Sequence, residues 1–139
     1  MHTNLESLSA AVKDYSRSWI EQYVVPDVIK EREAVFKQRL LYQLITSASE
    51  VLSQYNYENS KENGWDRIQA ASLVANLSDR NINIKTTRIE SGDSIRLDFS
   101  CSADVYNPDT EYSDKTKEIV DEILKLAYEN FHKTARYEV

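Results

Sequence analysis

Residues 94–105 read SIRLDFSCSADV, and polar and apolar side chains alternate along the whole stretch. Alternation with a period of two is typical of a β-strand that buries one face. Ile82 and Ile84 begin a shorter partner strand, and Ser91-Gly92-Asp93 supplies the turn between the two. The sequence therefore predicts an antiparallel hairpin over residues 82–105. Because a lone hairpin is marginally stable, it should lie on a helix, pair with a further strand or pair with a second copy of itself.

Three helices are predicted before the hairpin. The first, over residues 4–24, opens with a capping box in which Thr3 is the N-cap. Its apolar residues follow alternating steps of three and four, which is typical of a seam that packs against another helix: Leu5, Leu8, Val12, Tyr15 and Trp19. Pro26 suits the first turn of a new helix and biases Val25 towards extended backbone, so we expect a break or kink at residues 24–25.

The second helix, over residues 26–55, is expected to form the centre of the core because its apolar stripe is wide. The stripe contains Val28, Ile29, Val35, Phe36, Leu40, Leu41, Leu44, Ile45, Ala48, Val51, Leu52 and Tyr55. At 1.5 Å per residue, about 28 helical residues would be about 42 Å long. A globule of this chain length is only about 37 Å across, so the helix should bend or project towards a partner.

Two more helices complete the predicted fold. A polar loop, residues 56–64, with an Asn63-Gly64 turn leads to a helix over residues 65–78. The apolar side of that helix is expected to carry Trp65, Ile68, Ala71 and Ala75, with Val74 and Leu77 beside them. Ser113 is predicted to cap an amphipathic helix over residues 113–133. We therefore expect one α+β domain, residues 1–139, mostly helical, with about four helices around a long central helix and one antiparallel β-hairpin.

Composition narrows the class of protein. The 41% apolar and 29% charged fractions are those of an ordinary globular chain. The single cysteine, Cys101, excludes an intrachain disulfide. No apolar run approaches the roughly 20 residues of a membrane span, and residues 1–6 lack the layout of a signal peptide. We expect a cytoplasmic protein without a membrane partner.

Residues for catalysis or metal binding are sparse. His2, His132 and Cys101 show no ligand spacing, so we expect neither a metal nor a cofactor. Cys101 falls on the apolar face of its strand, where cysteine behaves as a small hydrophobe rather than a nucleophile. Two glycines cannot build a phosphate-binding loop, and the paired carboxylates are interpreted as solvated helix faces. An enzyme with an unorthodox site is the least favoured hypothesis.

Two sets of residues could form a protein-binding surface. Residues 98–122 hold eight acids and two bases, and an acidic surface there could occupy a basic groove on another protein. Its residues are Asp104, Asp109, Glu111, Asp114 and Glu118. Loop tyrosines and a tryptophan form the second set, since aromatic rings give contact area at low entropy cost: Tyr55, Tyr57, Trp65, Tyr106 and Tyr112. The leading hypothesis is a non-enzymatic regulator, adaptor or inhibitor that acts by binding another protein.

Two alternatives use one set of basic residues: Arg67, Arg80, Lys85, Arg88 and Arg96. The order helix, helix, hairpin resembles a winged helix, whose second helix would enter the major groove of DNA. A net charge of −6 and a loop of nine residues between the helices disfavour that alternative. The other is a small anionic, nucleotide-like ligand held at a subunit interface. A homodimer is expected, through helix packing or pairing of hairpin edges.

Overall fold

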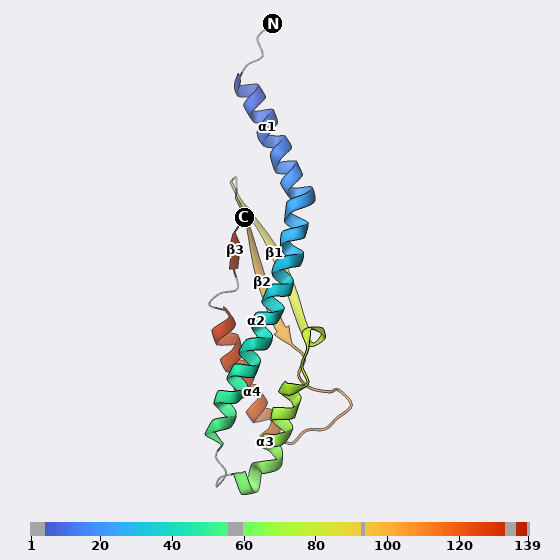
Figure 1. Cartoon of the computed structure of the whole chain (residues 1–139), viewed down its shortest axis with the longest axis vertical. Helices are drawn as coiled ribbons and strands as arrows, with labels where there is room; N and C mark the ends of the chain where they lie inside the picture. The colour runs from blue at the N-terminus through green and yellow to red at the C-terminus, as the bar shows by residue number, and fades with distance from the viewer. Residues whose placement is uncertain (1–4, 56–59, 93, 133–135, 139) are drawn as a thin grey trace. The chain divides into compact units, whose positions relative to one another are not determined.

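A computed structural model describes residues 5–55, 60–92, 94–132 and 136–138 (Figure 1). The chain divides into two units, residues 1–34 and 35–139, and each unit is described by itself below. The fold is α+β and mostly helical, with a long helix and an antiparallel hairpin, as predicted. Thr3, the predicted first cap, lies outside the described residues. The assignment of the chain to a single domain stays a prediction.

The first unit is helical, and the predicted break at residues 24–25 is wrong. Helix α1 (Leu5–Trp19) passes into a π-helical turn, η1 (Ile20–Val24), and then into α2 (Val25–Gln54). Val25 is itself helical, with φ −61° and ψ −46°, and its N–H donates to the carbonyl of Ile20. In a π-turn the backbone N–H bonds to the carbonyl five residues back. This geometry accommodates Pro26, whose ring would clash with the carbonyl four residues back in a regular α-helix. The described residues therefore form three long helical stretches rather than four.

The second unit contains the rest of α2 and all the later elements. These are α3 (Ser60–Ala75), the 3₁₀ turn η2 (Asp79–Asn81), β1 (Ile82–Ser91), β2 (Ser94–Ala103), α4 (Asp114–His132) and β3 (Arg136–Glu138). The predicted turn at Asn63-Gly64 is wrong, because both residues lie inside α3. A glycine in a helix costs only about 1 kcal/mol relative to alanine, so this dipeptide permits a turn without enforcing one.

The hairpin forms with its predicted turn and a longer first strand than expected. β1 pairs with β2 over ten residues each, from Ile82 opposite Ala103 to Ser91 opposite Ser94. Gly92 has φ +60°, a left-handed conformation that suits glycine in a tight hairpin turn. β3 then pairs with β2, with Tyr137 opposite Leu97, which makes β2 the central strand. Pairing with an unrecognised strand is thus one way in which the hairpin is stabilised.

The buried face of β2 forms one wall of the core in the second unit. Ile95, Leu97, Phe99 and Cys101 are all buried, which places the cysteine where the alternation predicted. The ring of Phe36 in α2 lies 4.6 Å from that of Phe99 and 6.1 Å from that of Phe131 in α4. The hairpin therefore also packs on helices. α4 contributes the most fully buried residues: Thr116, Ile119, Val120, Ile123, Ala127 and Phe131.

The predicted apolar side of the third helix is only partly right. Val74 is buried as expected, but Trp65 and Ile68 are 72% and 59% exposed, and Ala70, which was not predicted, is buried. The buried face of α3 is the one whose polar residues bond to α4, as described below, and small side chains there allow close helix packing. Ile45 was also expected in the core but is 62% exposed on α2. Periodicity alone overestimated the width of both apolar stripes.

Candidate interaction surface around helix α4

Ser113 determines where α4 begins and links it to α3. The backbone N–H of Thr116 donates to Ser113 Oγ at 3.1 Å, which confirms the predicted N-cap. Ser113 Oγ donates in turn to Asp66 Oδ1 on α3. Thr116 Oγ1 lies 2.9 Å from the same oxygen and 3.0 Å from Gln69 Oε1. These bonds hold the first turn of α4 against α3.

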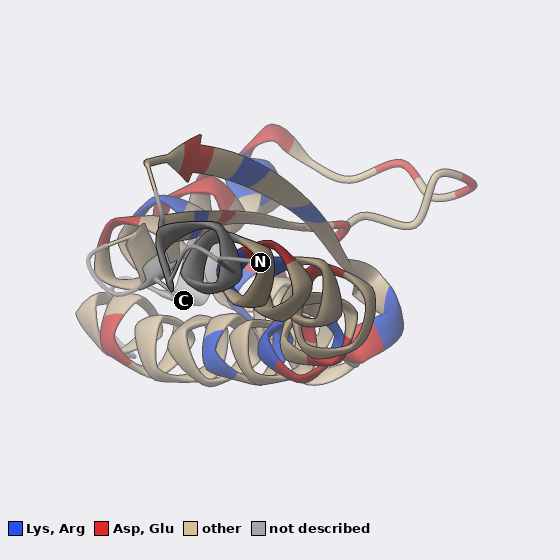
Figure 2. Ribbon diagram, turned by 90° about the horizontal axis from the view of Figure 1, so that it is seen from above, with Lys and Arg blue, Asp and Glu red and all other residues tan. Residues whose placement is uncertain are grey.

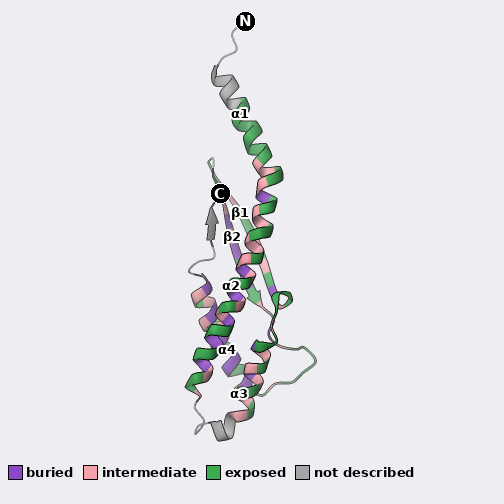
Figure 3. Cartoon of the chain, in the orientation of Figure 1, coloured by how far each residue is buried: buried purple, intermediate pink, exposed green. Residues whose placement is uncertain are grey.

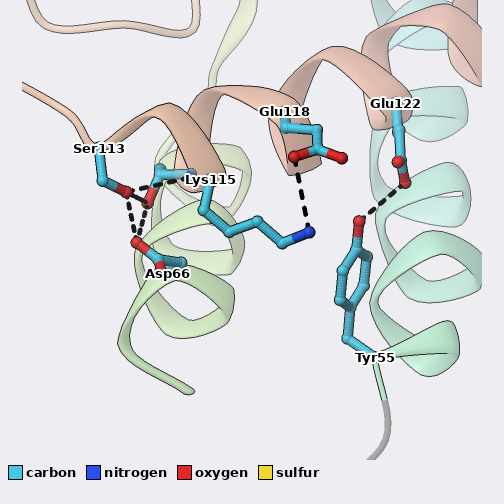
Figure 4. A network of polar contacts seen from close by, with 7 residues as sticks. Tyr55, Asp66, Ser113, Lys115, Glu118 and Glu122 are labelled. Carbon is cyan, nitrogen blue, oxygen red and sulfur yellow. Dashed lines mark hydrogen bonds and ion pairs between the residues drawn. The ribbon is translucent and has the colours of Figure 1, made fainter. Parts of the chain in front are cut away.

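Tyr55, just after the end of α2, contacts the next turns of α4. Its hydroxyl donates to Glu122 Oε2 at 3.1 Å (Figure 4). Lys115 Nζ lies 5.1 Å from the centre of the Tyr55 ring and 3.5 Å from Glu118 Oε2. Burial, and secondarily the hydrogen bond to Glu122, raise the pKa of Tyr55. A predicted loop aromatic and a predicted acidic residue therefore share one cluster.

Tyr106 and Tyr112 organise the loop between β2 and α4. Their ring centres lie 5.4 Å apart. The Tyr106 hydroxyl donates to Asp121 Oδ1 at 3.2 Å, and the backbone N–H of Asn107 donates to the Tyr112 hydroxyl at 3.0 Å. The N–H of Asp109 donates to Asn107 Oδ1, also at 3.0 Å, which closes a local turn. The loop is thus tied both to itself and to α4.

Ionisation of Tyr106 should make the protein sensitive to alkaline pH. Burial, and then the nearby charge of Asp121, raise the pKa of Tyr106 from 10.0 to about 12. Between these two pH values the unfolded chain binds fewer protons than the folded chain, so the free energy of unfolding should fall as pH rises. Chemical denaturation at a series of pH values should show a shallower fall for Tyr106→Phe than for the native chain. Tyr42→Phe, at a ring that is 67% exposed, controls for the loss of a hydroxyl; equal slopes in all three proteins would contradict the assignment.

Three carboxylates on this surface face water. Asp109, Glu111 and Asp114 are exposed and form no ion pair with the residues that the structure describes. Glu118 is exposed but pairs with Lys115, and Asp104 accepts a bond of 2.8 Å from Asn83 Nδ2. Acidic positions lie along the irregular loop in Figure 2. Within the predicted acidic set, these three are the residues best placed to meet a partner.

The predicted aromatic set is only partly gathered here. Tyr55, Tyr106 and Tyr112 are half-buried and hydrogen-bonded around α4. Trp65 lies exposed on α3, and Tyr57 falls outside the described residues. Sequence reasoning missed the partners that position this surface: Asp66, Gln69, Thr116, Asp121 and Glu122. No spacing in the sequence identifies these residues. Each of their hydrogen bonds joins segments that are far apart along the chain, or side chains that become neighbours only once a helix has formed.

The five basic residues do not form one patch. Cross-strand partners share a face of a sheet, so Arg88 opposite Leu97 lies on one face, while Lys85 opposite Ser100 lies on the other. Arg88 pairs with Glu90 at 3.0 Å, and Arg96 pairs with Asp98 at 3.2 Å.

The two remaining basic residues lie on other elements. Arg67 Nε, on α3, donates to the carbonyl of Leu52 at 3.1 Å, and Arg80 is exposed on η2. α2 ends at Gln54 and α3 begins at Ser60, so five residues separate the two helices, fewer than the nine expected.

Comparisons with known proteins add no identification, since no family model, curated protein or solved structure matches the chain. Among the described residues, no three His, Cys, Asp or Glu side chains gather as a metal-binding group. His132 is exposed near Tyr128 and Phe131, and His2 lies outside the described residues. None of the described helices is both long and apolar enough to cross a bilayer. The fold and the surface therefore define the class only as an α+β protein with an acidic and aromatic face around α4.

Proposed function

We propose that this chain is a non-enzymatic interaction protein, a small regulator, adaptor or inhibitor, which binds a basic surface of another protein through the face around α4. The observation that carries the proposal is the exposure of Asp109, Glu111 and Asp114 at the junction between the loop and α4. Opposite charge on the partner would speed association and select the correct orientation.

The rigidity of the surroundings supports this proposal. Ser113 and Tyr106 each bond to groups outside the loop, at Asp66 and Asp121 respectively. A surface that is already ordered loses less conformational entropy on binding than a flexible one. The half-buried rings of Tyr106 and Tyr112 lie beside the acidic positions and offer apolar contact area next to the charges.

Charge reversal tests the proposal. The triple variant Asp109→Lys, Glu111→Lys and Asp114→Lys should lose at least about tenfold in affinity for the partner, because attraction becomes repulsion. The partner would first be identified by affinity purification of the native chain, and its binding then measured by calorimetry at two salt concentrations. The affinity of the native chain should fall at the higher salt concentration.

The matched control changes the same amount of charge elsewhere on the second unit. Glu50→Lys, Asp79→Lys and Glu129→Lys alter three exposed residues on α2, η2 and α4. This control should bind like the native chain, and both triple variants should keep the native melting temperature within a few degrees, since exposed substitutions have small effects on stability. Native affinity in the first triple variant would show that the acidic residues serve solvation only.

The alternatives receive no support from the placement of the basic residues. A DNA-binding face or a pocket for an anionic ligand needs converging cations, and these five lie on both faces of the hairpin and on two helical elements. Arg67, Arg88 and Arg96 also have acceptors within the chain. The proposal therefore retains the acidic surface as the site of binding.

A further inference from the structure

The first unit presents a continuous row of exposed apolar side chains. Val12, Tyr15, Trp19 and Tyr23 are 56%, 74%, 50% and 59% exposed, and α1 is drawn as exposed along its described side chains (Figure 3). The rings of Trp19 and Tyr23 lie 6.1 Å apart, so the row extends from α1 into η1. Contiguous apolar surface of this kind marks a site of association.

The residues beside this row are small and uncharged. With Val12 and Tyr15 as the a and d positions of a heptad, Ala11 and Ser18 occupy g and Ser16 occupies e. These three residues are exposed and leave room for a second helix to approach. The charged residues fall outside the seam positions of this heptad. Residues 5–24 hold two bases and three acids, a net charge of −1: Glu6, Lys13, Asp14, Arg17 and Glu21. Two copies of the helix would therefore repel each other only weakly, although the whole chain carries −6.

We propose that residues 5–24 pair with the same residues of a second copy of the chain as an antiparallel helical dimer. A row with steps of three and four needs a partner with the same spacing, and this chain supplies one. In the antiparallel register that we propose, position 15 lies opposite position 12 and position 19 opposite position 8. Tyr15 and Trp19 then each meet an aliphatic residue, whereas parallel pairing would place Trp19 on Trp19 and Val12 on Val12, an uneven core.

The available area is sufficient for a specific contact. An aromatic side chain buries 150–250 Å² in a protein interior, and three aromatic residues of the row are half to three-quarters exposed. Together with Val12, these aromatic residues in two copies offer about 1,000 Å² of accessible surface for burial. That area is the lower bound for a specific interface. The dimer should consequently dissociate on dilution within the micromolar range.

Sedimentation velocity over a micromolar concentration series tests the association. The native chain should reach twice the 16.1 kDa mass of one chain. Tyr15→Glu and Trp19→Glu should each remain monomeric, because a carboxylate in the seam would lose its hydration. Lys13→Gln, on the outer side of the same helix, should dimerise like the native chain. A native monomer at the highest concentration, or a dimer that persists in both seam variants, would overturn the proposal.

Disulfide crosslinking tests the orientation. In the antiparallel register, Leu8→Cys and Trp19→Cys should crosslink to each other when the two variants are mixed, and neither should crosslink alone. Positions 8 and 19 are separated by about 16 Å along a helix, too far for a bond between like positions. The native Cys101 is 5% exposed and so does not compete. Crosslinking of Trp19→Cys with itself, or failure of the mixture, would overturn the antiparallel pairing.

Discussion

Phe36→Ala is expected to lower the free energy of unfolding of the second unit by about 3–5 kcal/mol. Phe36 is 2% exposed, and its ring contacts those of Phe99 and Phe131 at centre-to-centre distances of 4.6 and 6.1 Å. One side chain thus joins α2, β2 and α4. Alanine would remove these contacts and leave a cavity that the three elements cannot all close.

Urea denaturation followed by circular dichroism measures this loss. Tyr42→Ala is the matched control, since it removes an aromatic ring from the same helix at a position that is 67% exposed. It should change the free energy of unfolding by less than about 0.5 kcal/mol. If the two variants were equally stable, the aromatic cluster could not be the centre of this core.

Asp66→Ala is expected to lower the free energy of unfolding by about 2 kcal/mol, in the range measured for hydrogen bonds to charged groups. Asp66 Oδ1 accepts from Ser113 Oγ and lies 2.9 Å from Thr116 Oγ1, so one carboxylate connects α3 to the first turn of α4. Thr116 is fully buried and would keep Gln69 as a partner, which limits the loss.

A conservative variant separates hydrogen bonding from charge. Asp66→Asn keeps an oxygen that can accept both hydroxyl groups, so it should recover at least half of the lost stability in the same urea measurement. Asp109→Ala, at an exposed carboxylate, should be neutral. Equal losses for Asp66→Asn and Asp66→Ala would mean that the charge, rather than the bonds, stabilises this junction.

The elements with a strong local signal were predictable from sequence. β2 alternates with a period of two, and its apolar residues from Ile95 to Cys101 are buried as expected. The Ser113 cap and the Gly92 turn were also predictable, since each depends on groups within a few residues. The signal from Pro26 was equally local but misleading, because a π-turn offers a proline a place that regular helix geometry does not.

The candidate surface was predictable as a set of residues but not as an arrangement. The acidic residues and the loop tyrosines were both identified, yet nothing in the sequence indicated that Tyr55 would meet Glu122 or that Tyr106 would meet Asp121. Such contacts depend on the relative position of α4, the end of α2 and the loop. Periodicity carries no information about that position.

The sequence by itself determined the class of fold, the buried face of the central strand and the beginning of the last helix. Each follows from hydrophobic periodicity or from a hydrogen bond between neighbouring residues. Only the tertiary structure decided that α3 buries Ala70 and exposes Trp65 and Ile68, and that β3 completes the sheet. Both outcomes depend on partners far along the chain. The face of α3 that carries Asp66 and Gln69 bonds to Thr116 of α4, and the three residues of β3 pair with the edge of β2.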